Sequence, residues 1–107
     1  PAVVVDSVLQ AAAQAGTSAF TAGAAPSKEQ AMNVAEAALV RADRQKGIVR
    51  ASGCAEWVEI HELSDLDEVA LLGNPRMKSL GIGVAARRDA SPPSLAVLLL
   101  VDGTNCK

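Results

Sequence analysis

The feature that most constrains the fold is an uninterrupted apolar run near the C-terminus, Leu95 to Val101. A membrane-spanning helix needs about twenty such residues, so this run is too short to cross a bilayer. A short continuous run of this kind is typical of a strand that is buried on both faces. Helices that flank a small sheet on both sides would supply that burial. The run therefore predicts an α+β fold: a three-layer α-β-α sandwich with a small, mainly antiparallel sheet.

Two further stretches are predicted to be strands of this sheet. Residues 55–61 are rich in tryptophan, valine and isoleucine, which favour pleated structure. Leu80 to Ala86 alternates large apolar residues with small ones, so that Gly81 and Gly83 lie on one smooth face. Such a face predicts close approach by a helix, or less commonly by a ligand. Arg87 to Pro93 is expected to form a wide hairpin loop that leads into the apolar run.

Helices are predicted in the first half of the chain. One begins after Asp6, a residue type suited to the N-cap, and carries a face of small apolar residues. Residues 2–5 before it are either a short strand or the lead-in to this helix. A second helix begins at a capping box in residues 27–30 and ends at Gly47, a natural C-terminal residue. A short acidic helix is predicted from Ser64 to Leu72.

Size and charge limit the classes of function. The 107 residues fit a single domain, 1–107. Ten basic residues are scattered among twelve acidic ones, for a net charge of −2. This balance gives no electrostatic footprint for nucleic acid or an anionic membrane. We therefore expect no nucleic-acid partner and no membrane span in this chain.

The two cysteines, Cys54 and Cys106, lie far apart in the sequence. In a small secreted domain they would form a disulfide that closes a loop of about fifty residues and stabilises the fold by about 3–4 kcal/mol. In a cytosolic protein they would be two unrelated thiols. Cys106 follows a strong strand at the end of the chain, where a tail frays unless it is tied down. That placement favours the Cys54–Cys106 disulfide and an extracytoplasmic location.

His61 is the one histidine, and Glu59 and Glu62 flank it. On a strand, Glu59 and His61 would share a face about 7 Å apart, near enough to bracket an ion. A zinc site needs three or four ligands, so a solvated charge cluster is the favoured interpretation. The amine of Pro1 could act as a base or nucleophile, although a processing boundary explains this residue more simply. We predict no catalytic residue, metal or cofactor.

Several stretches resemble parts of the CAP superfamily, the fold of cysteine-rich secretory proteins, venom allergens and pathogenesis-related group 1 proteins. Val5 to Ala13 resembles the first helix with its apolar-Asp lead-in, and Cys54 to Val58 stands where the family has a strand with a Gly-Glu-Asn-Ile-like motif. Leu72 to Ala85 resembles the helix end, turn and Ile-Gly-Val-Gly-Val strand, and Leu95 to Val101 is similar to the last core strand. The resemblance covers about half of the chain and implies a single CAP-like domain. The chain is shorter than a typical CAP domain, which suggests a trimmed or clipped form.

The departures from the family bear on function. Its polar cavity gathers two histidines and two acidic residues that can hold a divalent metal. This chain has Gly16 and Phe20 where the first helix usually carries a histidine, and Gly73 and Asn74 where the second usually stands. Glu56 alone carries over, so the family's metal-dependent activity is not expected. Alanine-rich CAP-like domains without these residues resemble the surface antigens of coccidian parasites.

The resemblance implies a non-catalytic binding or antigen domain, secreted or displayed at the cell surface. With Glu59 and His61 added from the charge cluster described above, we expect a candidate ligand cavity that includes Glu56, Glu59 and His61. Its partner would be a protein, a lipid, or a second chain of the same precursor. Two alternatives stay open: a small enzyme that uses Pro1 or the Glu59/His61/Glu62 cluster, and a cytosolic α+β scaffold subunit.

Overall fold

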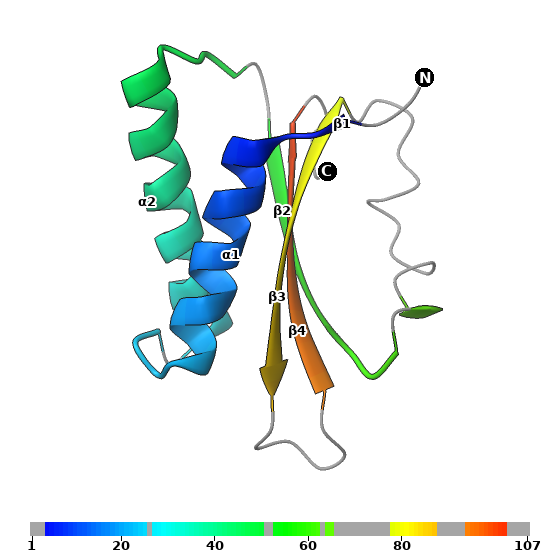
Figure 1. Cartoon of the computed structure of the whole chain (residues 1–107). Coiled ribbons are helices and arrows are strands. Elements are labelled where there is room, and N and C mark those ends of the chain that lie inside the picture. Colours follow the sequence, from blue (N-terminus) through cyan, green and yellow to red (C-terminus); the bar gives the residue numbers. More distant parts are fainter. Residues whose placement is uncertain are drawn as a thin grey trace.

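A computed structural model describes residues 4–25, 27–50, 53–62, 64–65, 78–87 and 94–102. Two helices lie side by side on one face of a small twisted sheet (Figure 1). The elements in chain order are β1 (Val4–Val5), α1 (Ser7–Thr21), α2 (Lys28–Lys46), β2 (Gly53–Ile60), β3 (Ser79–Arg87) and β4 (Ser94–Asp102).

The apolar run forms β4, which lies in the interior of the sheet. The strand order is β1-β3-β4-β2; β4 pairs antiparallel with both β2 and β3, and β1 pairs parallel with β3. Val97 and Leu98 point to opposite faces and both are fully buried. The α+β class and the small, mainly antiparallel sheet are therefore confirmed, and Val4–Val5 forms a short strand.

A separate apolar cluster lies on each face of the sheet. On the helix side, Leu98 and Leu100 pack with Leu9 of α1 and Ala35 of α2. The opposite side holds a second cluster: Ile60, Leu80, Val97, Leu99 and Val101. Burial of both faces of β4 is what the predicted sandwich requires. Both described helices lie on the same face, and most of the acidic helix predicted from Ser64 to Leu72 lies outside the described residues.

The helix ends follow the residues that predicted them. The Asp6 carboxylate accepts hydrogen bonds from the amides of Val8 and Leu9 at 2.8 and 3.2 Å, and so caps α1. The Ser27 hydroxyl accepts the amide of Gln30 at 3.2 Å and caps α2. Gly47 ends α2 with φ of 68°, the left-handed conformation that glycine adopts at little cost. These terminal signals are confirmed.

Close packing of α1 on β3 explains the glycines of that strand. A Cβ atom on Gly81 would overlap the backbone of Leu9, and one on Gly83 would overlap the backbone of Ala13. The smooth face of β3 is therefore a helix-packing surface, as predicted. The close approach brings two glutamine side chains of α1 against the open edge of β3. The Gln10 side chain accepts the Ile82 amide at 2.8 Å; that of Gln14 accepts the Val84 amide at 3.2 Å and donates to its carbonyl at 3.1 Å.

Candidate binding groove between α2 and β2

An open apolar groove of about 520 Å³ lies between α2 and β2. Leu9 and Leu100 form its floor, and the half-buried side chains of Met32 and Leu39 line the side formed by α2. The volume lies within the range of small-ligand and peptide sites. This groove is the candidate functional site.

The groove exists because α2 rests mainly on α1 and scarcely touches the sheet. Ala31 and Ala35 of α2 are fully buried, and these small residues let α2 pack closely against its neighbour. Gly53 and Ala55 of β2, by contrast, are exposed and line the groove, although Ala55 faces the helix layer. Two packed layers would normally cover such a position, so this part of the helix-side face is left open.

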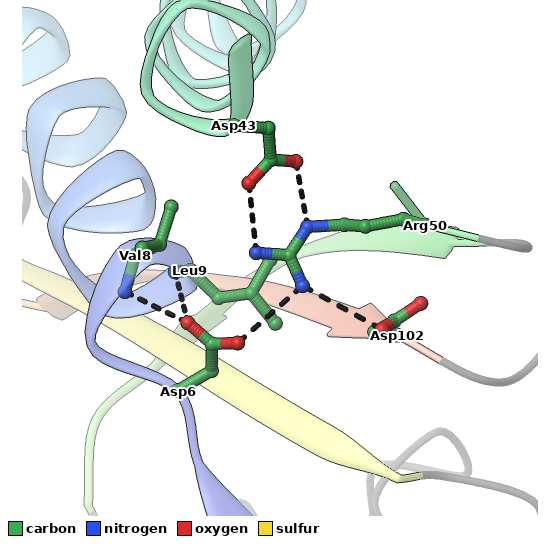
Figure 2. A network of polar contacts seen from close by, with 6 residues as sticks. All are labelled: Asp6, Val8, Leu9, Asp43, Arg50 and Asp102. Atoms are coloured by element: carbon green, nitrogen blue, oxygen red, sulfur yellow. Dashed lines mark hydrogen bonds and ion pairs between the residues drawn. The ribbon is translucent and has the colours of Figure 1, made fainter. Parts of the chain in front are cut away.

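A buried cluster around Arg50 borders the groove (Figure 2). Its guanidinium donates to both oxygens of Asp43, with Nε to Oδ2 at 2.7 Å and Nη2 to Oδ1 at 3.0 Å. Nη1 lies 3.4 Å from Asp6 Oδ2 and 3.5 Å from Asp102 Oδ2. The Arg50 side chain is only 13% exposed. One cation thus joins the start of α1, the last turns of α2 and the end of β4.

The cluster shifts the pKa values of Asp6 and Arg50. Burial by itself would raise the pKa of the Asp6 carboxyl, but the amides of Leu9 and Val8 and the charge of Arg50 outweigh it and hold that pKa below its ordinary value. The hydrogen bond to Asp43 raises the pKa of the Arg50 guanidinium against the opposing effect of burial. Both shifts favour the charged forms of Asp6 and Arg50. We assign this cluster a structural role, because it holds α1, α2 and β4 together beside the groove.

The two aromatic side chains meet farther along β2. The rings of Phe20 and Trp57 are 5.0 Å apart in an edge-to-face arrangement. Arg87 lies over Phe20, 5.3 Å from the ring centroid, and forms an ion pair with Glu59. This cluster fixes the end of α1 against β2 and β3.

The residues of the predicted ligand cavity do not lie on one face. Glu59 is on the helix side and pairs with Arg87. Glu56 alternates with it and therefore lies on the opposite face of β2. His61 is exposed just beyond the strand, where its amide donates to Asp65 at 3.1 Å. A cavity formed by Glu56, Glu59 and His61 stays a prediction, since nothing in the described residues brings all three together.

The remaining predicted residues fall partly outside the described residues. Pro1 lies there, as do Cys106 and the whole stretch from Leu72 to Met77 that entered the CAP resemblance. Cys54 lies on β2 and is not a free cysteine. Because Cys106 is outside the described residues, the Cys54–Cys106 pairing stays a prediction.

Within residues 4–102, as far as these are described, no group of three or more metal-ligating side chains gathers. None of the described helices combines the length and hydropathy that a bilayer crossing requires. Comparison of the chain with protein-family models, with curated proteins and with solved structures finds no match.

Sequence reasoning missed both the groove and the Arg50 cluster. Asp43 and Arg50 are seven residues apart on either side of the glycine that ends α2, which is a weak signal for a local ion pair. Asp102 comes near Arg50 only through the strand order. No local pattern announces a contact of that kind.

Proposed function

We propose that this chain is a non-catalytic, CAP-like binding domain, secreted or displayed at the cell surface, that holds its partner in the groove between α2 and β2. The observation that carries the proposal is the groove itself, which is open to solvent, lies over the buried side chains of Leu9 and Leu100, and is lined by the half-buried Met32 and Leu39. A mainly apolar groove of this volume with a few polar groups at its margin is the usual form of a ligand site.

The polar groups near the groove support a binding role over a catalytic one. The Asp6, Asp43 and Asp102 carboxylates surround Arg50, and the Glu59 carboxylate pairs with Arg87. A general acid or base must reach the proton of a substrate, and groups held in such pairs are poorly placed to do so. They are well suited to hold a surface in shape.

Uptake of a neutral apolar dye, Nile red, tests whether the groove binds at all. We expect saturable fluorescence enhancement with one site per chain. Ala55→Trp places a large side chain in the groove and should abolish this site. Val34→Trp is the matched control, because Val34 is 38% exposed on α2 and does not line the groove. The proposal is wrong if both variants bind the dye as the parent chain does, or if the parent chain binds none.

A further inference from the structure

The groove lies beside β2, which forms one edge of the sheet that the described residues make. Among the described strands, β2 has β4 as its sole neighbour. An edge strand presents a row of hydrogen-bonding groups that can accept another strand. The apolar groove therefore lies next to the outer edge of β2.

The register shows which backbone groups are available. Ile82 and Val84 of β3 donate their amides to side chains of α1, away from β4. The backbone N–H and C=O groups of successive residues in a strand point to alternate sides. Those of Gly83, between Ile82 and Val84, therefore point toward β4, where Gly83 is paired with Leu98.

The same alternation continues across β4. The backbone N–H and C=O groups of Leu98 point toward β3, so those of its neighbour Val97 point toward β2, where Val97 is paired with Val58. The outward-pointing amides and carbonyls of β2 therefore belong to Ala55, Trp57 and Glu59. Their side chains face the helix layer, and at Ala55 that side is the groove. A strand added here would direct the side chain opposite Ala55 into the groove under α2, because paired residues share a face.

Charge indicates the composition of that strand. Glu29 and Glu36, both exposed on α2, line the groove. The cation that borders it, Arg50, is surrounded by three carboxylates. A second copy of this chain would bring its own β2, with Glu56 and Glu59, to an already acidic rim. A segment that carries lysine or arginine beside apolar residues complements this acidic rim better.

Resting on the proposed binding function, we propose that the groove binds an extended, basic segment of a partner polypeptide, which adds to the outer edge of β2 as a further strand. Main-chain hydrogen bonds to Ala55 and Trp57 hold it in place. Its apolar side chains enter between α2 and β2, and its basic side chains meet Glu29 and Glu36.

Three synthetic peptides test this proposal. The probe is a capped eight-residue peptide that alternates valine or leucine with lysine. A second peptide has glutamate in place of lysine, and a third keeps the lysines but is N-methylated along one backbone edge, so that it cannot pair. Binding to the ¹⁵N-labelled chain is followed by NMR titration. We expect shifts in the amides of Ala55 and Trp57 with the probe, and binding at least about tenfold weaker for the other two peptides.

Variants of the chain distinguish the contribution of main-chain hydrogen bonds from that of charge. Ala55→Pro removes an outward amide while leaving the β4 ladder intact, a position at which sheets tolerate proline; we expect at least about tenfold weaker probe binding. Glu36→Gln should weaken binding severalfold, more at low salt than at high salt. Glu56→Gln, on the opposite face of β2, is the matched control and should bind as the parent chain does. Trp57 fluorescence and circular dichroism verify that each variant is folded.

The outcomes distinguish this inference from the proposed function. Equal binding of the N-methylated peptide would overturn strand addition, even in a chain that takes up Nile red at the groove. So would shifts confined to residues away from β2 and α2, or dye uptake without any peptide binding. If Ala55→Pro instead abolishes concentration-dependent self-association measured by sedimentation, the occupant is a second copy and the proposal is wrong.

Discussion

Replacing Gly83 by alanine tests the contact between α1 and β3 on which the frame of the groove depends. The added Cβ atom would overlap the carbonyl group of Ala13 and lie 2.7 Å from the backbone nitrogen of Gln14. Backbone atoms cannot rotate away as a side chain can. The helix must therefore move off the sheet, which weakens the hydrogen bonds between Gln14 and Val84.

The expected cost combines two effects. Overpacking a core costs about 1–3 kcal/mol, and each of the two Gln14–Val84 hydrogen bonds contributes about 0.5–1.5 kcal/mol. Alanine in place of a strand glycine returns about 0.5–1 kcal/mol. We expect Gly83→Ala to lower the free energy of unfolding by about 3 kcal/mol, which corresponds to a fall in Tm of roughly 12–24 °C.

Urea unfolding followed by the fluorescence of Trp57 measures this loss. Gly53→Ala is the control, because it makes the same substitution in the same sheet but its Cβ would lie 3.3 Å from the nearest atom, the Val101 carbonyl oxygen. It should change the free energy of unfolding by less than about 1 kcal/mol. If Gly83→Ala unfolds within about 0.5 kcal/mol of the parent chain, the contact between α1 and β3 is looser than described and the reasoning is refuted.

Three other predictions concern the frame of the domain. Arg50→Met should lower the free energy of unfolding by about 2–3 kcal/mol in urea unfolding, between the values for exposed and buried ion pairs, because it leaves three carboxylates without their cation; a loss below about 0.5 kcal/mol would contradict the structural role assigned to Arg50. The pKa of Asp6 is lower in the folded chain than its ordinary 3.8, so its stabilising effect is present above that pH and lost as the pH falls through the folded pKa. Asp6→Asn keeps an N-cap residue and should make the free energy of unfolding depend less on pH below about 4. An unchanged pH dependence in that range would contradict the lowered pKa of Asp6. Alkylation of the denatured, unreduced chain followed by intact mass measurement should show no modified thiol if Cys54 and Cys106 are paired, and two modified thiols would remove the basis for a secreted domain.

Local chemistry accounts for the parts of the fold that the sequence predicted. Asp6, Ser27 and Gly47 act on the few residues beside them, so their positions alone are sufficient to place the helix ends. The apolar run could be recognised as an interior strand because water is excluded from both of its faces. Gly81 and Gly83 predicted a close helix because no other common residue leaves that space.

The candidate site could not be predicted in the same way. The groove exists because α2 packs on α1 and scarcely touches β2, and no short pattern predicts which of two elements distant in sequence a helix will rest on. Glu56 and Glu59 were predicted to share a cavity, yet their alternation along β2 puts them on opposite faces of the sheet. The ion pairs of Arg50 with Asp6 and Asp102 span long stretches of chain, and they become visible only once the strand order is known.

The glutamine contacts of α1 have a consequence for stoichiometry. One margin of the sheet is taken up by the short strand β1 and then by two amide side chains that imitate a neighbouring strand. Among the described strands this leaves β2 as the long edge without a second neighbour, so the strand addition proposed above would extend each molecule once. Strand addition at that edge would therefore give a one-to-one complex with the partner rather than a continuous ribbon of molecules.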